Sequence, residues 1–185
     1  MTLAAGVPEE PIGDDDLPSL TADDFKSAFR HHPGGVAVVT AQGPDGHVAL
    51  TATSVSSVSA DPPLLLFSVS DFSSSAPTIR AASTVVVHLI DETSLSIAKL
   101  GATSGIDRFA DPTLWETLPT GERIFLGTRW IRAKVIERLD SGTATVVVAQ
   151  AVQTNVSAAD PPPAPPALVY VNRTWHRLDD ASQIA

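Results

Sequence analysis

The apolar positions of this chain fall mostly in short runs separated by proline, glycine and aspartate, a pattern typical of β-strands. Asp45-Gly46 and Asp140-Ser141-Gly142 stand between such runs and predict hairpin turns. We expect strands at residues 36–41, 47–55, 64–69, 85–90, 130–138, 143–154, 168–170 and 174–178.

Helical signals are fewer. Thr21 predicts a helix start, because its hydroxyl can cap backbone N–H groups and Asp23 and Asp24 then lie in the first turn. This helix carries Phe25 and Phe29 on one face and ends in the His-His-Pro-Gly-Gly run. Further helices are expected at 76–82 and 92–100, and an irregular connection from 101 to 115.

Many short strands with few helices favour a mainly β fold, a closed or nearly closed β-barrel with peripheral helices. The strands at 168–170 and 174–178 are expected to close its sheet. A doubly wound parallel sheet would need regular alternation of strands and helices. With 185 residues, 43% of them apolar, the chain is expected to form one domain. We expect a disordered acidic tail at residues 1–20 and the folded domain at 21–180.

The charge and composition of the chain exclude several classes of function. A formal net charge of −9 argues against a nucleic-acid partner or an anionic membrane, since both need a basic surface. The chain has no cysteine, which excludes disulfides and thiolate chemistry. No apolar run approaches the roughly 20 residues of a membrane-spanning helix, and no signal-peptide pattern is seen. A cytoplasmic protein is therefore expected.

The most informative stretch is the hydroxyl-rich segment 50–67, which ends in Asp-Pro-Pro and an apolar strand. A second serine cluster at 73–75 precedes a predicted helix, and Arg108 lies in a sparsely charged connection. Hydroxyls, backbone N–H groups and one arginine suffice to bind a phosphate without a glycine-rich loop. The alternative is that each serine cluster is only a loop. Walker-type and Gly-x-Gly-x-x-Gly motifs are absent.

No metal site or catalytic side chain is predicted. None of the five histidines pairs with another at the i, i+4 spacing of a helical zinc motif, and no Gly-x-Ser-x-Gly elbow exists. His88 is unusual because it lies inside an apolar strand. It is expected to be either a hydrogen-bonded structural residue or a ligand contact.

Several motifs together resemble those of the flavin reductase-like family, from about Asp24 to Leu178. They include Phe29 followed by the strand at 34–40, and the Thr-Ala-Thr-Ser run with Asp-Pro-Pro after it. The Ser73–Ser75 loop, Asp107-Arg108-Phe109, Trp115 and the closing Leu168-Val169-Tyr170 also fit.

The resemblance implies a Greek-key antiparallel fold, the FMN-binding split barrel. It implies an NAD(P)H:flavin oxidoreductase that reduces FMN or FAD with NADH or NADPH, forms a homodimer and supplies reduced flavin to a separate monooxygenase. The cofactor-binding residues it implies are Thr51, Ala52, Thr53, Ser54, Val55, Ser56, Ser57, Ser73, Ser74, Ser75, His88 and Arg108.

The chain departs from the family pattern in three places. His88 stands where the family often has asparagine, and the hairpin run Ser141-Gly142-Thr143-Ala144 lacks a histidine often found near the nicotinamide. Val171-Asn172-Arg173 replaces the usual run near the C-terminus. Two alternatives therefore stay open: a non-catalytic flavin-binding or carrier protein, and a split-barrel binder of another cofactor such as haem or a deazaflavin.

Overall fold

The computed structural model describes residues 18–159 and 165–184, arranged in two compact units that divide between His32 and Pro33. In the first unit, helix α1 (Ala22–Phe29) begins where expected: the Thr21 hydroxyl accepts a hydrogen bond from Asp24 N–H at 3.1 Å. Most of the predicted acidic tail, residues 1–17, lies outside the described residues. The division falls inside the range 21–180, whose unity as one domain stays a prediction.

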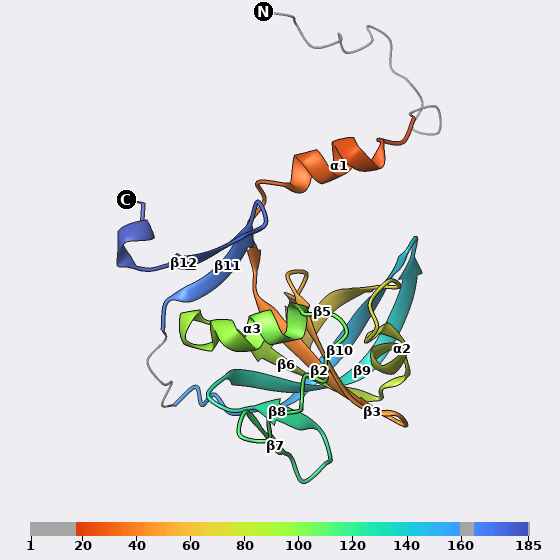
Figure 1. Cartoon of the computed structure of the whole chain (residues 1–185), viewed down its shortest axis with the longest axis vertical. Helices are drawn as coiled ribbons and strands as arrows, with labels where there is room; N and C mark the ends of the chain where they lie inside the picture. The colour runs from red at the N-terminus through yellow and green to blue at the C-terminus, as the bar shows by residue number, and fades with distance from the viewer. Residues whose placement is uncertain (1–17, 160–164, 185) are drawn as a thin grey trace, which may run out of the picture. The chain divides into compact units, whose positions relative to one another are not determined.

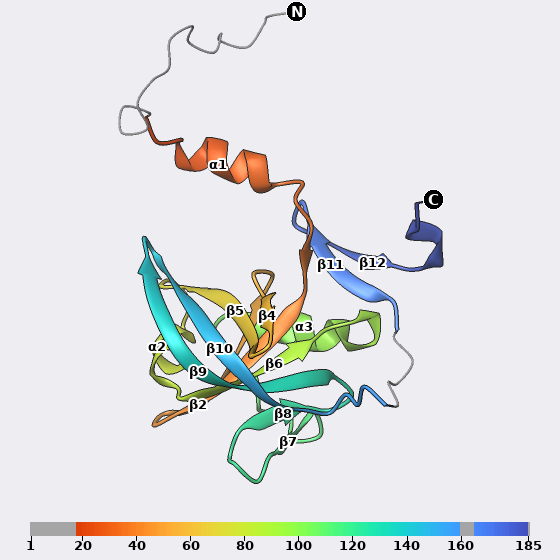
Figure 2. The same cartoon turned by 180° about the vertical axis from the view of Figure 1, so that it is seen from behind.

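The second unit is built on one antiparallel sheet of seven strands, in the order β3-β2-β6-β9-β10-β5-β4. Figure 1 and Figure 2 show this sheet curling on itself. The predicted Greek-key antiparallel barrel is confirmed, because β2 pairs with β6 and β10 with β5 across long connections. The strands are β2 (Ala37–Gly43), β3 (Gly46–Ala52), β4 (Ser56–Ala60), β5 (Pro63–Ser70), β6 (Thr84–Leu89), β9 (Arg129–Ser141) and β10 (Ala144–Thr154).

Both predicted hairpin turns are present. Gly43 pairs with Gly46 at the end of the β2–β3 hairpin, and Ser141 pairs with Ala144 at the end of the β9–β10 hairpin. Gly46 has φ +116° and Gly142 has φ +63°, backbone angles that residues with a side chain rarely adopt, and this explains the glycine in each turn.

Strand β2 separates two hydrophobic clusters. Its odd-numbered residues, such as Val39, face the barrel interior, which helix α2 (Ala76–Ala81) also fills through Ile79. Its even-numbered residues, such as Val38, face helix α3 (Leu95–Ala102), which follows the short 3-10 helix η2 (Glu92–Ser94). Alternation along one strand thus provides cores on both of its faces.

The structure corrects three expectations. Residues 56–60 form strand β4, paired with β5, instead of a loop. The connection expected to be irregular ends in a small sheet of β7 (Trp115–Thr117) and β8 (Arg123–Phe125). The last two strands, β11 (Ala167–Val171) and β12 (Thr174–Leu178), do not close the main sheet but form a separate one with β1 (Gly34–Gly35). Strand pairing is a long-range choice, so local patterns place strands better than they place partners.

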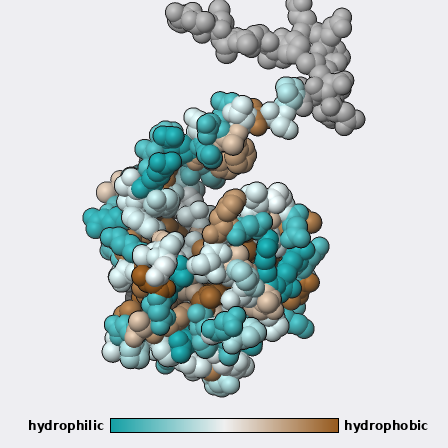
Figure 3. Space-filling view, turned by 45° about the vertical axis from the view of Figure 1, so that its right-hand side comes forward, coloured by the Kyte–Doolittle hydropathy of each residue, from teal (hydrophilic) through white to brown (hydrophobic). Residues whose placement is uncertain are grey.

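The 3-10 helix η3 (Asp180–Ser182) follows β12. On the face drawn in Figure 3, hydrophobic residues form small patches among hydrophilic and neutral ones. No helix within residues 18–159 and 165–184 combines the length and apolar character needed to cross a membrane.

Candidate functional site

Helix α3 holds the predicted Thr-Ala-Thr-Ser segment at its start. The Thr51 hydroxyl donates a hydrogen bond to the Ala98 carbonyl at 2.6 Å. A Cβ added to Gly101 would lie 2.5 Å from the Thr51 hydroxyl and 3.2 Å from its backbone nitrogen. The helix therefore approaches β3 this closely only because position 101 is glycine.

Ser54 fixes the same segment on its other side, at the seam between β3 and β5. Its hydroxyl accepts a hydrogen bond from Ser68 N–H at 2.9 Å and donates to the Ser68 carbonyl at 3.3 Å. One side chain thus replaces a pair of backbone ladder bonds where the chain leaves β3 for β4.

Residues 53–55 connect β3 to β4. They lie outside the strands, and their N–H groups donate no hydrogen bond within the described part of the chain. Thr53 and Ser57 are exposed, and their hydroxyls likewise have no partner there. A run of unpaired N–H groups with free hydroxyls can bind an acceptor such as a phosphate or a ring carbonyl.

The second serine cluster is divided in its roles. The Ser75 side chain is fully buried, and its hydroxyl donates to the Ala49 carbonyl at 3.1 Å, which ties the loop to β3. The Ser73 hydroxyl accepts from Ser75 N–H at 3.3 Å. Ser74 alone is exposed, with no side-chain hydrogen bond to the described residues. Ser74 is therefore the member of this cluster best placed to meet a ligand.

Arg108 lies near the end of α3. Its Nη2 donates to the Thr103 carbonyl at 2.7 Å, just beyond the last turn of the helix that packs on Thr51. Burial lowers the pKa of the guanidinium from its usual value, but an arginine stays protonated near neutral pH. Its Nε is buried and has no partner among the described residues. Arg108 thus adds a fixed positive charge with unused donor capacity.

His88 is different, because it is fully buried and both ring nitrogens are used. Nδ1 lies 3.0 Å from the Val38 carbonyl, and Nε2 accepts from Phe125 N–H at 3.1 Å. These partners require the neutral tautomer with the proton on Nδ1. Burial lowers the pKa of His88 to about 4, against the smaller raising effect of the bond to Val38. The structural interpretation of His88 fits this geometry, and no ring nitrogen is left for a ligand.

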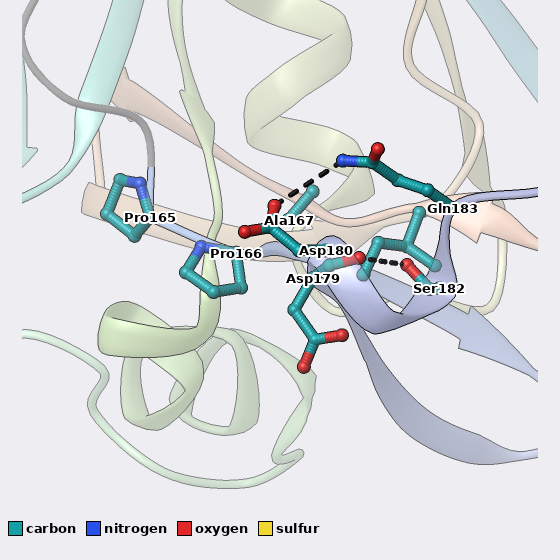
Figure 4. A pocket seen from close by; sticks show the side chains of 8 residues that line it. Pro165, Pro166, Ala167, Asp179, Asp180, Ser182 and Gln183 are labelled. Carbon is teal, nitrogen blue, oxygen red and sulfur yellow. Dashed lines mark hydrogen bonds between the residues drawn. The ribbon is translucent and has the colours of Figure 1, made fainter.

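A surface pocket elsewhere does not share the character of this site. Figure 4 shows it between Pro165 and Pro166 on one side and the C-terminal residues Asp179, Asp180 and Gln183 on the other. Its lining holds two carboxylates and no cationic side chain. Such a lining repels a phosphate. Within residues 18–159 and 165–184, no group of three or more potential metal ligands is found.

The sequence analysis also missed a buried ion pair made by the loop before β8. Glu122 is buried, accepts a hydrogen bond from Thr84 at 2.6 Å and pairs with Arg132 at 2.8 Å. Burial would raise the pKa of Glu122, but bonds from Thr120, Thr84 and Arg132 lower it overall. These partners are far apart in sequence, so no local pattern could have revealed them.

The fold is an antiparallel β-barrel, and the candidate site is a surface of unpartnered backbone N–H groups and hydroxyls beside β3 and α3. The flavin reductase like domain family matches residues 29–179, and the chain belongs to this family. The split-barrel fold expected from the resemblance is confirmed.

Two relatives and two solved structures illustrate the similarity. The NADH:FMN oxidoreductase of Rhodococcus qingshengii is 38% identical over 91% of this chain and 88% of its own length. The reductase component of a 4-nitrophenol 4-monooxygenase/4-nitrocatechol 2-monooxygenase from Rhodococcus opacus is 26% identical over 83% of this chain and 82% of its own.

A flavin reductase domain protein from Arthrobacter sp. FB24 superposes with a TM-score of 0.77 at 28% identity, covering 85% of this chain and 95% of its own. A Streptomyces globisporus NADH:FAD oxidoreductase, solved with NAD and FAD fragments, shares the fold with a TM-score of 0.75 at 21% identity, over 94% of this chain and 99% of its own.

Proposed function

We propose that this protein is an NAD(P)H:flavin oxidoreductase that reduces FMN or FAD and supplies the reduced flavin to a partner monooxygenase. The observation that carries the proposal is the backbone at 53–55, whose N–H groups have no partner among the described residues and which follows the Thr51 segment held by α3, in a chain of the flavin reductase family. Relatives named NADH:FMN oxidoreductase, and one named as a monooxygenase reductase component, support the reaction and its place.

The residues present fit a flavin nucleotide. Arg108 provides the positive charge for the phosphate, and Thr53, Ser57 and Ser74 provide exposed hydroxyls for the phosphate and ribityl oxygens. The backbone N–H groups of 53–55 are free to bond the carbonyl groups of the ring. Four other predicted contacts act differently, because their hydroxyls form hydrogen bonds to backbone groups of the protein and so hold the surface in place. They are Thr51, Ser54, Ser73 and Ser75.

The chain's part in the reaction is binding and orientation. A bound flavin supplies the redox chemistry by accepting a hydride from the nicotinamide. The segment 51–57 is anchored through Thr51 and Ser54, so it can hold the two rings in contact without a side-chain acid or base. No catalytic side chain is assigned.

The direct test is oxidation of NADH or NADPH by the purified protein with FMN or FAD, followed at 340 nm. We expect turnover well above the protein-free rate with at least one pair. A protein that retains flavin but oxidises neither nicotinamide would be a carrier, the function favoured by the absence of a histidine at 141–144. A haem or deazaflavin spectrum would contradict the flavin assignment.

Supply to a monooxygenase has its own test. Reduced flavin formed under anaerobic conditions should pass through a dialysis membrane to an acceptor on the other side. Retention of the reduced flavin by the protein would contradict the role of a supplier. A cytoplasmic location stays a prediction.

We also propose a homodimer, on the outer face of β5 and β10. Leu64 and Leu66 alternate with residues of the barrel core and so point outward, as do Val146 and Val148. Val148 lies opposite Leu66, and Val146 lies opposite Leu139, which is 59% exposed. Apolar side chains gathered on an outer sheet face are typical of an interaction site.

Sedimentation equilibrium tests the homodimer. We expect a dimer at micromolar concentration and a monomer for Leu66→Glu, which places a charge in the centre of this face. A wild-type protein that sediments as a monomer would contradict the proposal.

A further inference from the structure

Arg123, on β8, stacks on aromatic rings instead of pairing with an acid. Its guanidinium carbon lies 3.7 Å from the centre of the Trp115 ring and 5.2 Å from that of Phe109. No carboxylate partner of Arg123 is found within residues 18–159 and 165–184. Its Nε is buried and has no hydrogen-bond partner there. The side chain therefore acts through its flat face, for which arginine is suited and lysine is not.

The arginine is itself firmly placed. Its carbonyl accepts a hydrogen bond from the Thr40 hydroxyl at 2.8 Å, which ties β8 to β2. Two residues later, Phe125 donates its N–H to the buried His88. Hydrogen bonds with Thr40 and His88 of the main sheet thus fix the strand that carries the guanidinium.

Of the two rings beneath Arg123, Phe109 belongs to the turn that carries Arg108, and Trp115 begins β7. Phe109 stacks on Phe125, with ring centres 5.3 Å apart and planes 4° from parallel. Its N–H donates to the Asp107 carboxylate at 2.8 Å, and its carbonyl accepts from Trp115 Nε1 at 3.0 Å. Both backbone groups and the ring of Phe109 are therefore held, and Arg108 precedes it directly.

We propose that Arg123 is a positioning residue for the flavin phosphate site: by stacking on Trp115 and Phe109 it holds the 107–109 turn and so aims Arg108 at the phosphate. The inference rests on the proposed function, because it assumes that Arg108 binds a flavin phosphate. In this proposal Arg123 acts through Arg108 and not by touching the flavin. Its effect is confined to ligands that carry the phosphate.

The test compares FMN with riboflavin, which has the same ring and ribityl chain but no phosphate. Dissociation constants of both are measured by quenching of flavin fluorescence in wild type, Arg123→Met and Arg123→Lys. Methionine keeps an apolar stem over the rings but removes the guanidinium. We expect FMN binding to weaken on the order of tenfold in Arg123→Met, with riboflavin within about twofold of wild type.

Arg123→Lys separates stacking from charge. If the planar stack positions Arg108, lysine restores only part of the FMN affinity. Full restoration by lysine would overturn the proposal, because charge alone would then suffice. Arg177→Met is the matched control, since it removes the same charge from an exposed position on β12 and should leave both flavin affinities unchanged.

Two outcomes separate this inference from the proposed function. If Arg108→Ala leaves the FMN-to-riboflavin affinity ratio of wild type unchanged, the phosphate assignment itself is wrong. If Arg108→Ala lowers that ratio and both folded Arg123 variants leave it unchanged, only the role of Arg123 is overturned. A circular dichroism melt establishes that each variant is folded, and Arg123→Lys carries the test if Arg123→Met does not fold.

Discussion

His88 and Arg108 were both predicted to touch the cofactor, yet the structure gives them opposite surroundings. His88 is fully buried on β6, and both of its ring nitrogens bond to backbone groups. Arg108 lies half-buried at the end of α3, with one bond to a carbonyl and a buried Nε that has no described partner. His88 uses both of its hydrogen-bonding nitrogens within the fold, whereas Arg108 retains a donor that can bond to a ligand.

The comparison shows that burial constrains a polar side chain in an apolar strand more than one in a loop, because a buried polar group without hydrogen-bond partners destabilises the fold. A buried imidazole without partners would lose the free energy of its hydration, so the fold provides partners. His88 still reaches the site indirectly, because Phe125, whose N–H it accepts, stacks on the ring of Phe109 next to Arg108. His88 holds the support, and Arg108 is the residue proposed to bind the ligand.

The largest effect that would test this contrast is on stability. His88→Leu leaves the buried Phe125 N–H without its acceptor and removes a donor from the Val38 carbonyl. We expect a loss on the order of 3–5 kcal/mol in the free energy of unfolding, measured by urea denaturation. A loss below about 1 kcal/mol would show that His88 is not structural.

The pH dependence of stability follows from the same histidine. Its pKa is about 4 in the folded protein and 6.5 in the unfolded chain, so the unfolded chain binds more protons between these values. The stabilisation is complete above pH 6.5 and declines as the pH falls toward 4, by about 3 kcal/mol in all.

The matched variant for the pH effect is His88→Gln, which stays polar but does not titrate. Denaturant midpoints from pH 7.5 to 4 should fall more steeply for wild type than for this variant. Parallel curves would contradict the assignment of a buried neutral histidine.

Arg108→Ala should have the converse effect. It removes a charge-assisted bond to the phosphate, worth about 1.5–3 kcal/mol, which corresponds to a roughly 10- to 150-fold weaker FMN affinity. The free energy of unfolding should change little, because the described bonds of Arg108 are confined to one carbonyl. Fluorescence titration with FMN measures the loss, and unchanged affinity would remove Arg108 from the site.

The smallest expected effect concerns Ser54, which stands between the two cases. Ser54→Ala removes the hydroxyl that accepts from Ser68 N–H at the seam, so we expect a loss of about 1 kcal/mol in stability. Thr53→Ala is its control: this exposed hydroxyl has no described partner, so stability should hold while FMN affinity falls a few-fold. Equal losses of stability in both variants would contradict the prediction that Ser54 stabilises the fold whereas Thr53 binds the ligand.

Much of the fold could be predicted from local patterns. Thr21 as a helix cap, the turns at Gly46 and Gly142 and the strands of the barrel follow from alternation, capping and glycine chemistry, which act within a few residues. The strand at 56–60 escaped, because its serines resemble a loop when its partner β5 is unknown. The aromatic support of Arg108 escaped as well, since Arg123 stacks on residues 8 and 14 positions away.

The candidate site shows the same limit. The sequence alone showed hydroxyls at 51–57 and 73–75 and an arginine at 108. The resemblance to a family then predicted that these residues bind a flavin. Only the tertiary structure decided which hydroxyls remain free: those of Thr51, Ser54 and Ser75 are used inside the protein, while those of Thr53, Ser57 and Ser74 are not. The physical reason is that residue type sets what a side chain can bond, whereas packing against distant strands and helices sets what is left for a ligand.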